Sequence, residues 1–456
     1  MTTRRTFLKV LGTGAAAAMV GLPPLRSIAD IGQANDGEFF LFIHAAGGWD
    51  VTLWADPRNE ARGILHPAST ENTDPSQVRL WRDAPLEGGA KTFELIRPPG
   101  SSLVLGPGAG GLVDIVDRIT IVNGLAMNTV AHPDGATFSA TGRHLQGGRV
   151  ASPSVDTMIS NELGKEQLFP TVSVRFPSAY VGDNLDRRVV PLTIGDVGSI
   201  SRTLSRTQLY DANPERDRVT ALLSLEAEDL ARRSTYHDVA DGMRLQYASL
   251  QRMLASNLGD VFSAEGLKTA HPELTYKTRF LGAAALDAAF AIEAMKRNVV
   301  RCVSFAAGNF DTHAGNYKTH AHAQQELFDL VTATLRSLDA IPHPTKAGAK
   351  LSEHTHILVV SEFCRTPQIN LGNGRDHYPN NSALVISPRF KPNFVFGATD
   401  ADQLLPRPVK RFIDGERAIA PPDLLATFVS AFGIDPRKYM RDGEIVPELL
   451  RAAAAA

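Results

Sequence analysis

Acidic and histidine residues follow several short apolar segments of this 456-residue chain. They occur in Gly47-Gly48-Trp49-Asp50, Asp311-Thr312-His313, Ser361-Glu362-Phe363 and Asp376-His377. Carboxylates and neutral imidazoles together bind cations such as zinc and manganese, whereas carboxylates alone suit magnesium or calcium. The sequence therefore predicts a divalent metal site, with candidate ligands Asp50, Asp311, His313, Glu362, Asp376 and His377.

Other residues could act on a substrate, and the candidate catalytic residues are Thr129, His132 and Arg365. His132 follows the apolar segment 119–124, and the hydroxyls of Thr129, Thr137 and Ser139 lie near it in sequence. A metal ion that lowers the pKa of a hydroxyl turns it into a nucleophile without a histidine base. Spacing alone does not single out one of the three hydroxyls.

Glu362 ends a fully apolar segment, where an ionised carboxylate needs a cation or a strong hydrogen-bond donor. Arg365, three residues later, is one such donor. Two interpretations follow: Glu362 is a metal ligand, or it forms a buried pair with Arg365 that fixes the loop.

The segments before these residues have the apolar character of buried strands, and they alternate with helical segments. The expected strands are 38–44, 119–124, 171–176, 299–305 and 356–360, and the expected helices include 152–163, 276–297 and 319–338. This alternation predicts a doubly wound, mostly parallel α/β sheet with helices on both faces. Because the carboxyl ends of parallel strands meet at one edge, the acidic and histidine residues should lie together there.

Residues 30–451 are expected to form a single domain of this kind. Within it, residues from about 202 to 260 are highly charged and helical in pattern, and we interpret them as a solvated helical insertion. The two cysteines, Cys302 and Cys364, could pair if their strands are neighbours, but two buried thiols are the favoured interpretation.

The start of the chain predicts export. Arg4-Arg5-Thr6-Phe7-Leu8-Lys9 precedes an alanine-rich apolar stretch, and Ser27-Ile28-Ala29 offers a small-x-small cleavage site. We therefore expect a twin-arginine signal peptide over residues 1–29, a mature chain from near Asp30, the twin-arginine translocation machinery as a partner, and a periplasmic or otherwise exported protein. The alternatives are an uncleaved segment that anchors the protein and a buried first helix.

Composition excludes other classes of partner. A formal net charge of −2 and the absence of a long basic run give no electrostatic case for nucleic acid binding. No later apolar segment reaches the roughly 20 residues that span a bilayer, so we expect no multi-span membrane insertion.

The motifs together resemble a known family. Gly47-Gly48-Trp49-Asp50, Phe310-Asp311-Thr312-His313, the segment from Ser361 to Pro367 and Asp376-His377 are similar to those of the exported bacterial proteins in the domain-of-unknown-function family number 1501. That family looks like a branch of the alkaline phosphatase and sulfatase superfamily. The resemblance covers nearly the whole mature chain and extends to the segments 423–427 and 432–436.

This resemblance implies an exported hydrolase of phosphate or sulfate esters that uses one or two metal ions and a hydroxyl nucleophile. It places Asp50, Asp311, His313 and His377 at the metal, and Thr129, shortly before His132, as the nucleophile. Phe363 stands where the superfamily has a histidine, so Asp376 would have to compensate. The substrate would be a small-molecule or polymer ester. The alternative is an exported binding or assembly factor that keeps the fold but is catalytically degenerate.

Overall fold

The apolar segment near residue 40 forms β1 (Phe39–Ala45), a fully buried strand in the middle of a sheet. The structure, a computed structural model, describes residues 37–57, 95–204 except 177, 213–233, 244, 258–274 and 280–451 except 373. The predicted signal peptide over residues 1–29 lies outside this part of the chain. Among the described residues, no helix is long and apolar enough to cross a membrane.

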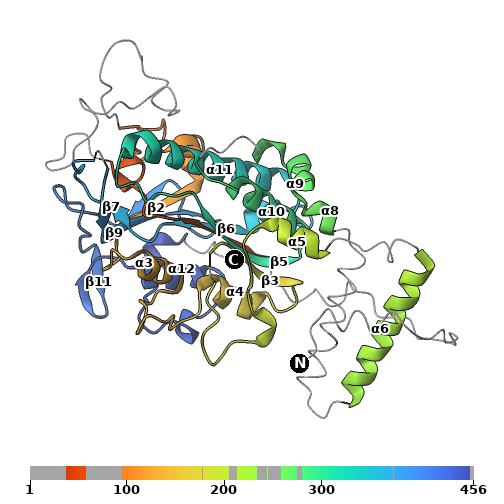
Figure 1. Cartoon of the computed structure of the whole chain (residues 1–456). Coiled ribbons are helices and arrows are strands. Elements are labelled where there is room, and N and C mark those ends of the chain that lie inside the picture. The colour runs from red at the N-terminus through yellow and green to blue at the C-terminus, as the bar shows by residue number, and fades with distance from the viewer. Residues whose placement is uncertain are drawn as a thin grey trace. The chain divides into compact units, whose positions relative to one another are not determined.

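The main sheet contains eight described strands. Besides β1 they are β2 (Ile119–Ala126), β3 (Phe169–Val174), β4 (Leu192–Ile194), β5 (Val300–Ala307), β6 (Thr355–Val360), β9 (Asn380–Ile386) and β10 (Phe394–Phe396). Their order is β10-β2-β9-β6-β1-β5-β3-β4 (Figure 1). β9 is antiparallel to β6 and β2, and the other adjacent pairs of this sheet are parallel.

Two small antiparallel ribbons lie outside the main sheet. β7 (Cys364–Arg365) pairs with β8 (His377–Tyr378), and β11 (Lys410–Phe412) pairs with β12 (Gly415–Arg417). The first ribbon matters for the site, because it sets Arg365 directly opposite His377.

Helices cover both faces of the sheet (Figure 1). The described α-helices are α3 (His132–Thr141), α4 (Val155–Leu163), α5 (Val197–Leu204), α6 (Asn213–Arg233), α8 (Leu258–Val261), α9 (Ala264–Ala270), α10 (Ala284–Lys296), α11 (Ala321–Ala340) and α12 (Pro421–Ala431). Successive side chains of a strand point to opposite faces. Accordingly, Phe39 and Leu41 of β1 share a core with α10 and α11, whereas Phe40 and Phe42 share one with α4 and α12. The predicted mostly parallel α/β fold is confirmed.

The edge of the sheet explains why residues distant in sequence meet. β1, β5 and β6 are parallel neighbours, so the loops after all three begin at one edge. β2 ends there as well, and antiparallel β9 begins there, because Ala126 at the end of β2 pairs with Asn380 at the start of β9. His377 therefore reaches this edge from the start of a strand, unlike the other candidate residues.

Two helices begin later than predicted. α4 begins at Val155 with Ser154 as its N-cap, not at Ser152. α10 begins at Ala284, because Gly282 has a left-handed backbone with φ +59° that ends any helix before it. Residues 275–279 of this predicted helix lie outside the described part.

The predicted helical insertion, 202–260, is only partly described. It contains α6, whose ends carry acidic and basic residues, while 205–212, 234–243 and 245–257 lie outside the described residues. The single-domain boundaries and this insertion therefore stay predictions. Cys302 and Cys364 are both free and buried, as the favoured interpretation expected.

Candidate metal centre

Asp311 lies in the loop after β5, and its backbone packs closely on the chain at the end of β1. A Cβ atom on Gly47 would lie 2.4 Å from the backbone nitrogen of Asp311, and Gly47 has φ +113°. Only glycine permits this close approach. Arg365 Nη2 donates to Asp311 Oδ1 at 2.7 Å and so fixes the carboxylate at the sheet edge.

His132 is the first residue of α3, and its imidazole faces the Asp311 carboxylate. Its Nδ1 donates to Glu362 Oε1 at 2.7 Å, and its Nε2 lies 3.5 Å from Asp311 Oδ2. Gly135, on the same helical turn, allows this contact, because an added Cβ would lie 2.4 Å from the Glu362 carbonyl oxygen. The first turn of α3 therefore packs directly on the loop after β6.

His377 is placed by the ribbon of β7 and β8. Its Nδ1 donates to the Val130 carbonyl oxygen at 2.8 Å, and its Nε2 lies 3.2 Å from Asp311 Oδ1. A backbone carbonyl only accepts hydrogen bonds, so the proton of a neutral His377 must be on Nδ1. The Nε2 atom is thus left with a lone pair that faces Asp311.

His313 is oriented in the same way by Asp376. Its Nδ1 donates to Asp376 Oδ1 at 2.8 Å, and its Nε2 lies 3.0 Å from Asp311 Oδ1 and 3.1 Å from His377 Nε2. Asn370 Nδ2 also donates to Asp376 Oδ1, at 3.2 Å. Asp376 therefore stands behind His313, on the far side of its ring from Asp311.

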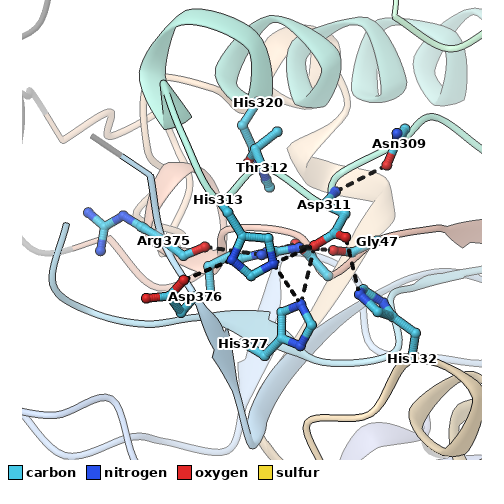
Figure 2. Close-up of polar contacts among 12 residues, drawn as sticks. Gly47, His132, Asn309, Asp311, Thr312, His313, His320, Arg375, Asp376 and His377 are labelled. Carbon is cyan, nitrogen blue, oxygen red and sulfur yellow. Dashed lines mark hydrogen bonds and ion pairs between the residues drawn. The ribbon is translucent and has the colours of Figure 1, made fainter. Parts of the chain in front are cut away.

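Figure 2 shows the resulting arrangement: His132, His313 and His377 surround Asp311. We call these four residues the cluster. The ligand atoms of His132, Asp311 and His377 all lie within 4.8 Å of one another, as a shared metal ion requires. The side chains of Asp311 and His313 are 39% and 48% exposed, so a substrate could reach the cluster from solvent.

The donor atoms fit a divalent cation. Each histidine uses Nδ1 as a donor to an acceptor behind it, which leaves the three Nε2 lone pairs and the Asp311 carboxylate directed at one region. Lone pairs facing one another at about 3 Å repel unless a proton or a cation lies between them. Metal-binding histidines are held by the same kind of Nδ1 hydrogen bond to a carboxylate or a carbonyl. Two imidazoles with one carboxylate, and the imidazole of His313 beside them, suit zinc, manganese or iron(II) better than magnesium or calcium.

The electrostatics of the cluster also favour a cation. Burial acts to raise the pKa of Asp311, but the hydrogen bond from Arg365 and its positive charge outweigh this effect, and the pKa of Asp311 is lowered to about 2. The hydrogen bond to Glu362 raises the pKa of His132 despite partial burial. Positive charge is therefore stabilised between Glu362 and Asp311, and a metal ion would compete with a proton for that position.

Glu362 orients His132 and does not point into the cluster. Its Oε1 also accepts from the Gly47 N–H at 2.7 Å, and its Oε2 accepts from Ser361 Oγ at 2.9 Å and lies 3.2 Å from His44 Nε2. Burial acts to raise the pKa of Glu362, but hydrogen bonds from His132 and His44 hold it well below its ordinary value. Glu362 thus stays ionised behind His132.

Glu362 and Arg365 do not form the buried ion pair of the alternative interpretation. Arg365 is fully buried and donates to Asp311 and to the backbone carbonyls of Gly47, Gly48 and Arg375. Phe363, between the two, is buried and packs its ring on His132 and His377, with centroid distances of 4.9 and 4.6 Å. The phenylalanine therefore helps to hold two imidazoles in place.

The structure does not bring Asp50 to the cluster. Asp50 is fully buried, and its carboxylate accepts from the N–H and hydroxyl of Thr52, from Asn316 Nδ2 at 2.8 Å, and pairs with Arg375 Nε at 3.0 Å. Both oxygens are therefore occupied within the protein. Burial acts to raise the pKa of Asp50, but Arg375 and His320 hold it below its ordinary value.

Thr129 lies in the loop between β2 and α3, three residues before His132. Its hydroxyl accepts from the Ala131 N–H at 3.3 Å and hydrogen-bonds to Asp134, so its described contacts are local. Thr137 and Ser139 bond back to carbonyl groups of α3. The assignment of Thr129 as the nucleophile stays a prediction.

Sequence reasoning missed that His132 belongs to the group that could hold a metal ion, and it missed the roles of Val130 and Gly135. His132-Pro133 at a helix start, with Gly135 on the same turn, was the available signal. His377 is held by the backbone carbonyl of Val130, and a contact with the backbone cannot be predicted from residue types.

The chain is thus an α/β protein with a histidine and aspartate cluster that could hold a metal ion at one edge of its sheet. It belongs to the family described as "Protein of unknown function (DUF1501)", which matches residues 106–445 and so includes the whole cluster. This family is the one that the motifs predicted.

Other comparisons add little detail. No curated protein matches the sequence. One similar solved structure comes from a study of glycosaminoglycan metabolism by Bacteroides thetaiotaomicron; it is 8% identical, with a TM-score of 0.33, over 92% of this chain and 78% of that chain. Another was solved in complex with its substrate D-glucosamine-2-N,6-O-disulfate; it is 9% identical, with a TM-score of 0.31, over 91% of this chain and 83% of that chain.

Proposed function

We propose that this protein is an exported, metal-dependent hydrolase of phosphate or sulfate esters. The observation that carries the proposal is the convergence of His132 Nε2, His377 Nε2 and the Asp311 carboxylate, each fixed by a partner behind it. Side chains held in this way are preorganised for a metal ion. Export rests on the twin-arginine segment at residues 4–9.

His132, Asp311 and His377 would hold the ion, with His313 beside them at the more exposed side. A divalent cation supplies Lewis acidity, which polarises an ester oxygen and lowers the pKa of a hydroxyl group or water molecule. Val130, Glu362 and Asp376 keep the imidazoles oriented, and Phe363 keeps water from the inner side of two rings.

The cluster is open on the side where His313 and Asp311 are exposed. A ligand set of three protein groups with an accessible remaining position is typical of catalytic metal sites, whereas structural sites are closed. The arrangement therefore fits an enzyme better than a purely structural ion site.

The test combines metal analysis with hydrolysis of two chromogenic probes, 4-nitrophenyl phosphate and 4-nitrophenyl sulfate. The natively exported protein should carry a first-row metal and hydrolyse at least one probe, and His132→Ala should lose both properties. His354→Ala is the matched control, because His354 lies at the other end of β6 and pairs with Glu38. Bound metal without hydrolysis of any ester would contradict the hydrolase and support the binding-factor alternative.

A further inference from the structure

The number of metal ions follows from two buried arginines. A two-metal hydrolase needs a second set of oxygen ligands about 3.5–4 Å from the first ion. Among the carboxylates near the cluster, Glu362 and Asp376 already accept hydrogen bonds behind His132 and His313. The two that remain are Asp50, beneath the loop after β1, and Asp311 itself. Each of these carboxylates is paired with an arginine whose side chain is fully buried.

The ion pair between Asp50 and Arg375 makes the Asp50 carboxylate unavailable to a second metal ion. Asp50 and Arg375 are both 0% exposed, and Arg375 Nη1 is also held by the carbonyl oxygens of Thr366 and Pro367. Breaking such a buried pair leaves an uncompensated charge away from water, which is strongly unfavourable. Asp50 is therefore not free to turn toward a metal ion.

The Arg365 side chain occupies the region beside Asp311 where a second metal ion would bind. Its guanidinium contacts Asp311 Oδ1 at 2.7 Å, the carbonyl oxygen of Gly48 at 2.7 Å, the carbonyl oxygen of Gly47, and the carbonyl oxygen of Arg375 at 3.0 Å. Carboxylate and carbonyl oxygens are the ligands that hard divalent cations choose. The guanidinium thus lies where such a cation would bind.

We propose that the centre holds a single metal ion and that the guanidinium of Arg365 takes the place of a second one. This inference rests on the proposed metal-dependent function and specifies it further. Arg365 is a positioning residue: it acts on the ion through Asp311, and its side chain is too buried to touch substrate.

The experiment counts ions by native mass spectrometry and by electron paramagnetic resonance of the Mn(II)-loaded full chain. The unsubstituted protein should bind one Mn(II) per chain and give the six-line spectrum of an isolated ion. Asp50→Asn should also bind one ion, with a dissociation constant within about threefold of the unsubstituted value. Asp311→Asn should weaken binding at least a hundredfold.

Arg365→Ala removes the guanidinium and frees the oxygens around it, so this variant should take up a second Mn(II) and show spin coupling between the two ions. A purely structural arginine would not produce that spectrum. Arg365→Lys, which keeps the positive charge, should retain the six-line spectrum.

Two ions in the unsubstituted chain, or the loss of an ion in Asp50→Asn, would overturn the single-ion centre while leaving the hydrolase proposal intact. An unchanged six-line spectrum of Arg365→Ala at saturating Mn(II) would overturn the role of Arg365. No bound ion in the unsubstituted chain would overturn both proposals. The count in the unsubstituted chain needs no variant, so it decides the question even if a variant fails to fold.

Discussion

Each imidazole of the cluster is oriented by a different kind of acceptor: a buried carboxylate for His132, an exposed carboxylate for His313 and a backbone carbonyl for His377. Glu362 is the most constrained of these acceptors, since its oxygens also take hydrogen bonds from Gly47 and Ser361. Under the proposed function, its charge would raise the affinity of His132 for a cation without contact between Glu362 and the ion.

Replacing that charge should weaken metal binding. We predict that Glu362→Gln lowers the affinity for zinc or manganese by roughly 10–100-fold, the usual cost of losing an acceptor behind a metal-binding histidine. Isothermal titration with the metal measures this change. Glu416→Gln on the exposed β12 strand is the control. Equal affinities of Glu362→Gln and the unsubstituted protein would mean that Glu362 does not act through His132.

At this scale the sequence predicted the residue types well and their partners poorly. Asp311, His313 and His377 were predicted as ligands and lie together, but Asp50 has the same kind of motif and lies elsewhere. The difference is made by Arg375, which is 325 positions away in sequence and pairs with Asp50 only once the sheet has formed. No local pattern contains that information.

Among the elements, α3 has the most direct effect on the cluster, because its first residue is His132. We predict that Gly135→Ala lowers metal affinity at least tenfold. The added Cβ would lie 2.4 Å from the Glu362 carbonyl oxygen, and α3 must shift to relieve this clash. The better helix propensity of alanine, about 1 kcal/mol, works in the opposite direction on stability.

Metal titration and thermal unfolding of the same variant separate these effects. Gly195→Ala is a suitable control, because a Cβ at Gly195 meets no atom within 4 Å. Undiminished affinity in Gly135→Ala would show that the packing of α3 on the loop after β6 does not set the position of His132.

The opposite end of β1 gives a prediction about pH. Glu38 Oε1 and Oε2 accept hydrogen bonds from His354 at 2.9 Å and His356 at 3.0 Å. Burial acts to raise the pKa of Glu38, but these two hydrogen bonds lower it from 4.5 to about 2. A carboxyl group with a depressed native pKa stabilises the fold above its unfolded pKa, and this stabilisation is lost as the pH falls toward the native pKa.

Glu38→Gln should therefore be less stable than the unsubstituted protein at pH 7, and the difference should shrink between pH 4.5 and pH 3. Urea unfolding at pH 7, 5 and 3.5 measures it. A difference that stays constant over this range would mean that the ionisation of Glu38 is not coupled to folding.

The predicted strands are apolar segments, among which 171–176 alternates with polar residues, and all five are present within a few residues of the expected bounds. β9 was not predicted, because it begins with Asn380, Asn381 and Ser382, which are unfavourable strand residues by composition. These polar side chains are tolerated since two of them bond within the core, Asn381 to Trp49 and Ser382 to Asn123. The sequence therefore could not predict the antiparallel strand β9, nor that His377 lies at the sheet edge just before it.

For the whole molecule, metal binding should be coupled to stability. The cluster joins the loops after β1, β5 and β6 to α3 and to the β7–β8 ribbon, so an ion there would hold together segments from residue 47 to residue 378. A ligand that binds only the folded state stabilises it by about 4 kcal/mol at a thousand times its dissociation constant.

We therefore predict that a chelator lowers the thermal unfolding midpoint by several degrees and that added zinc or manganese restores it. His132→Ala should show neither change, because it lacks a ligand. Calorimetric scans with and without the chelator measure both. An identical midpoint in the chelated and the metal-loaded protein would argue against a resident ion.

The most direct measurement is anomalous diffraction from crystals of the protein loaded with zinc or manganese. We predict one strong peak per chain, within bonding distance of His132 Nε2, an Asp311 carboxylate oxygen and His377 Nε2, with Glu362 and Arg365 outside that distance. A peak bound by Asp50, or no peak at the cluster under saturating metal, would contradict the metal centre.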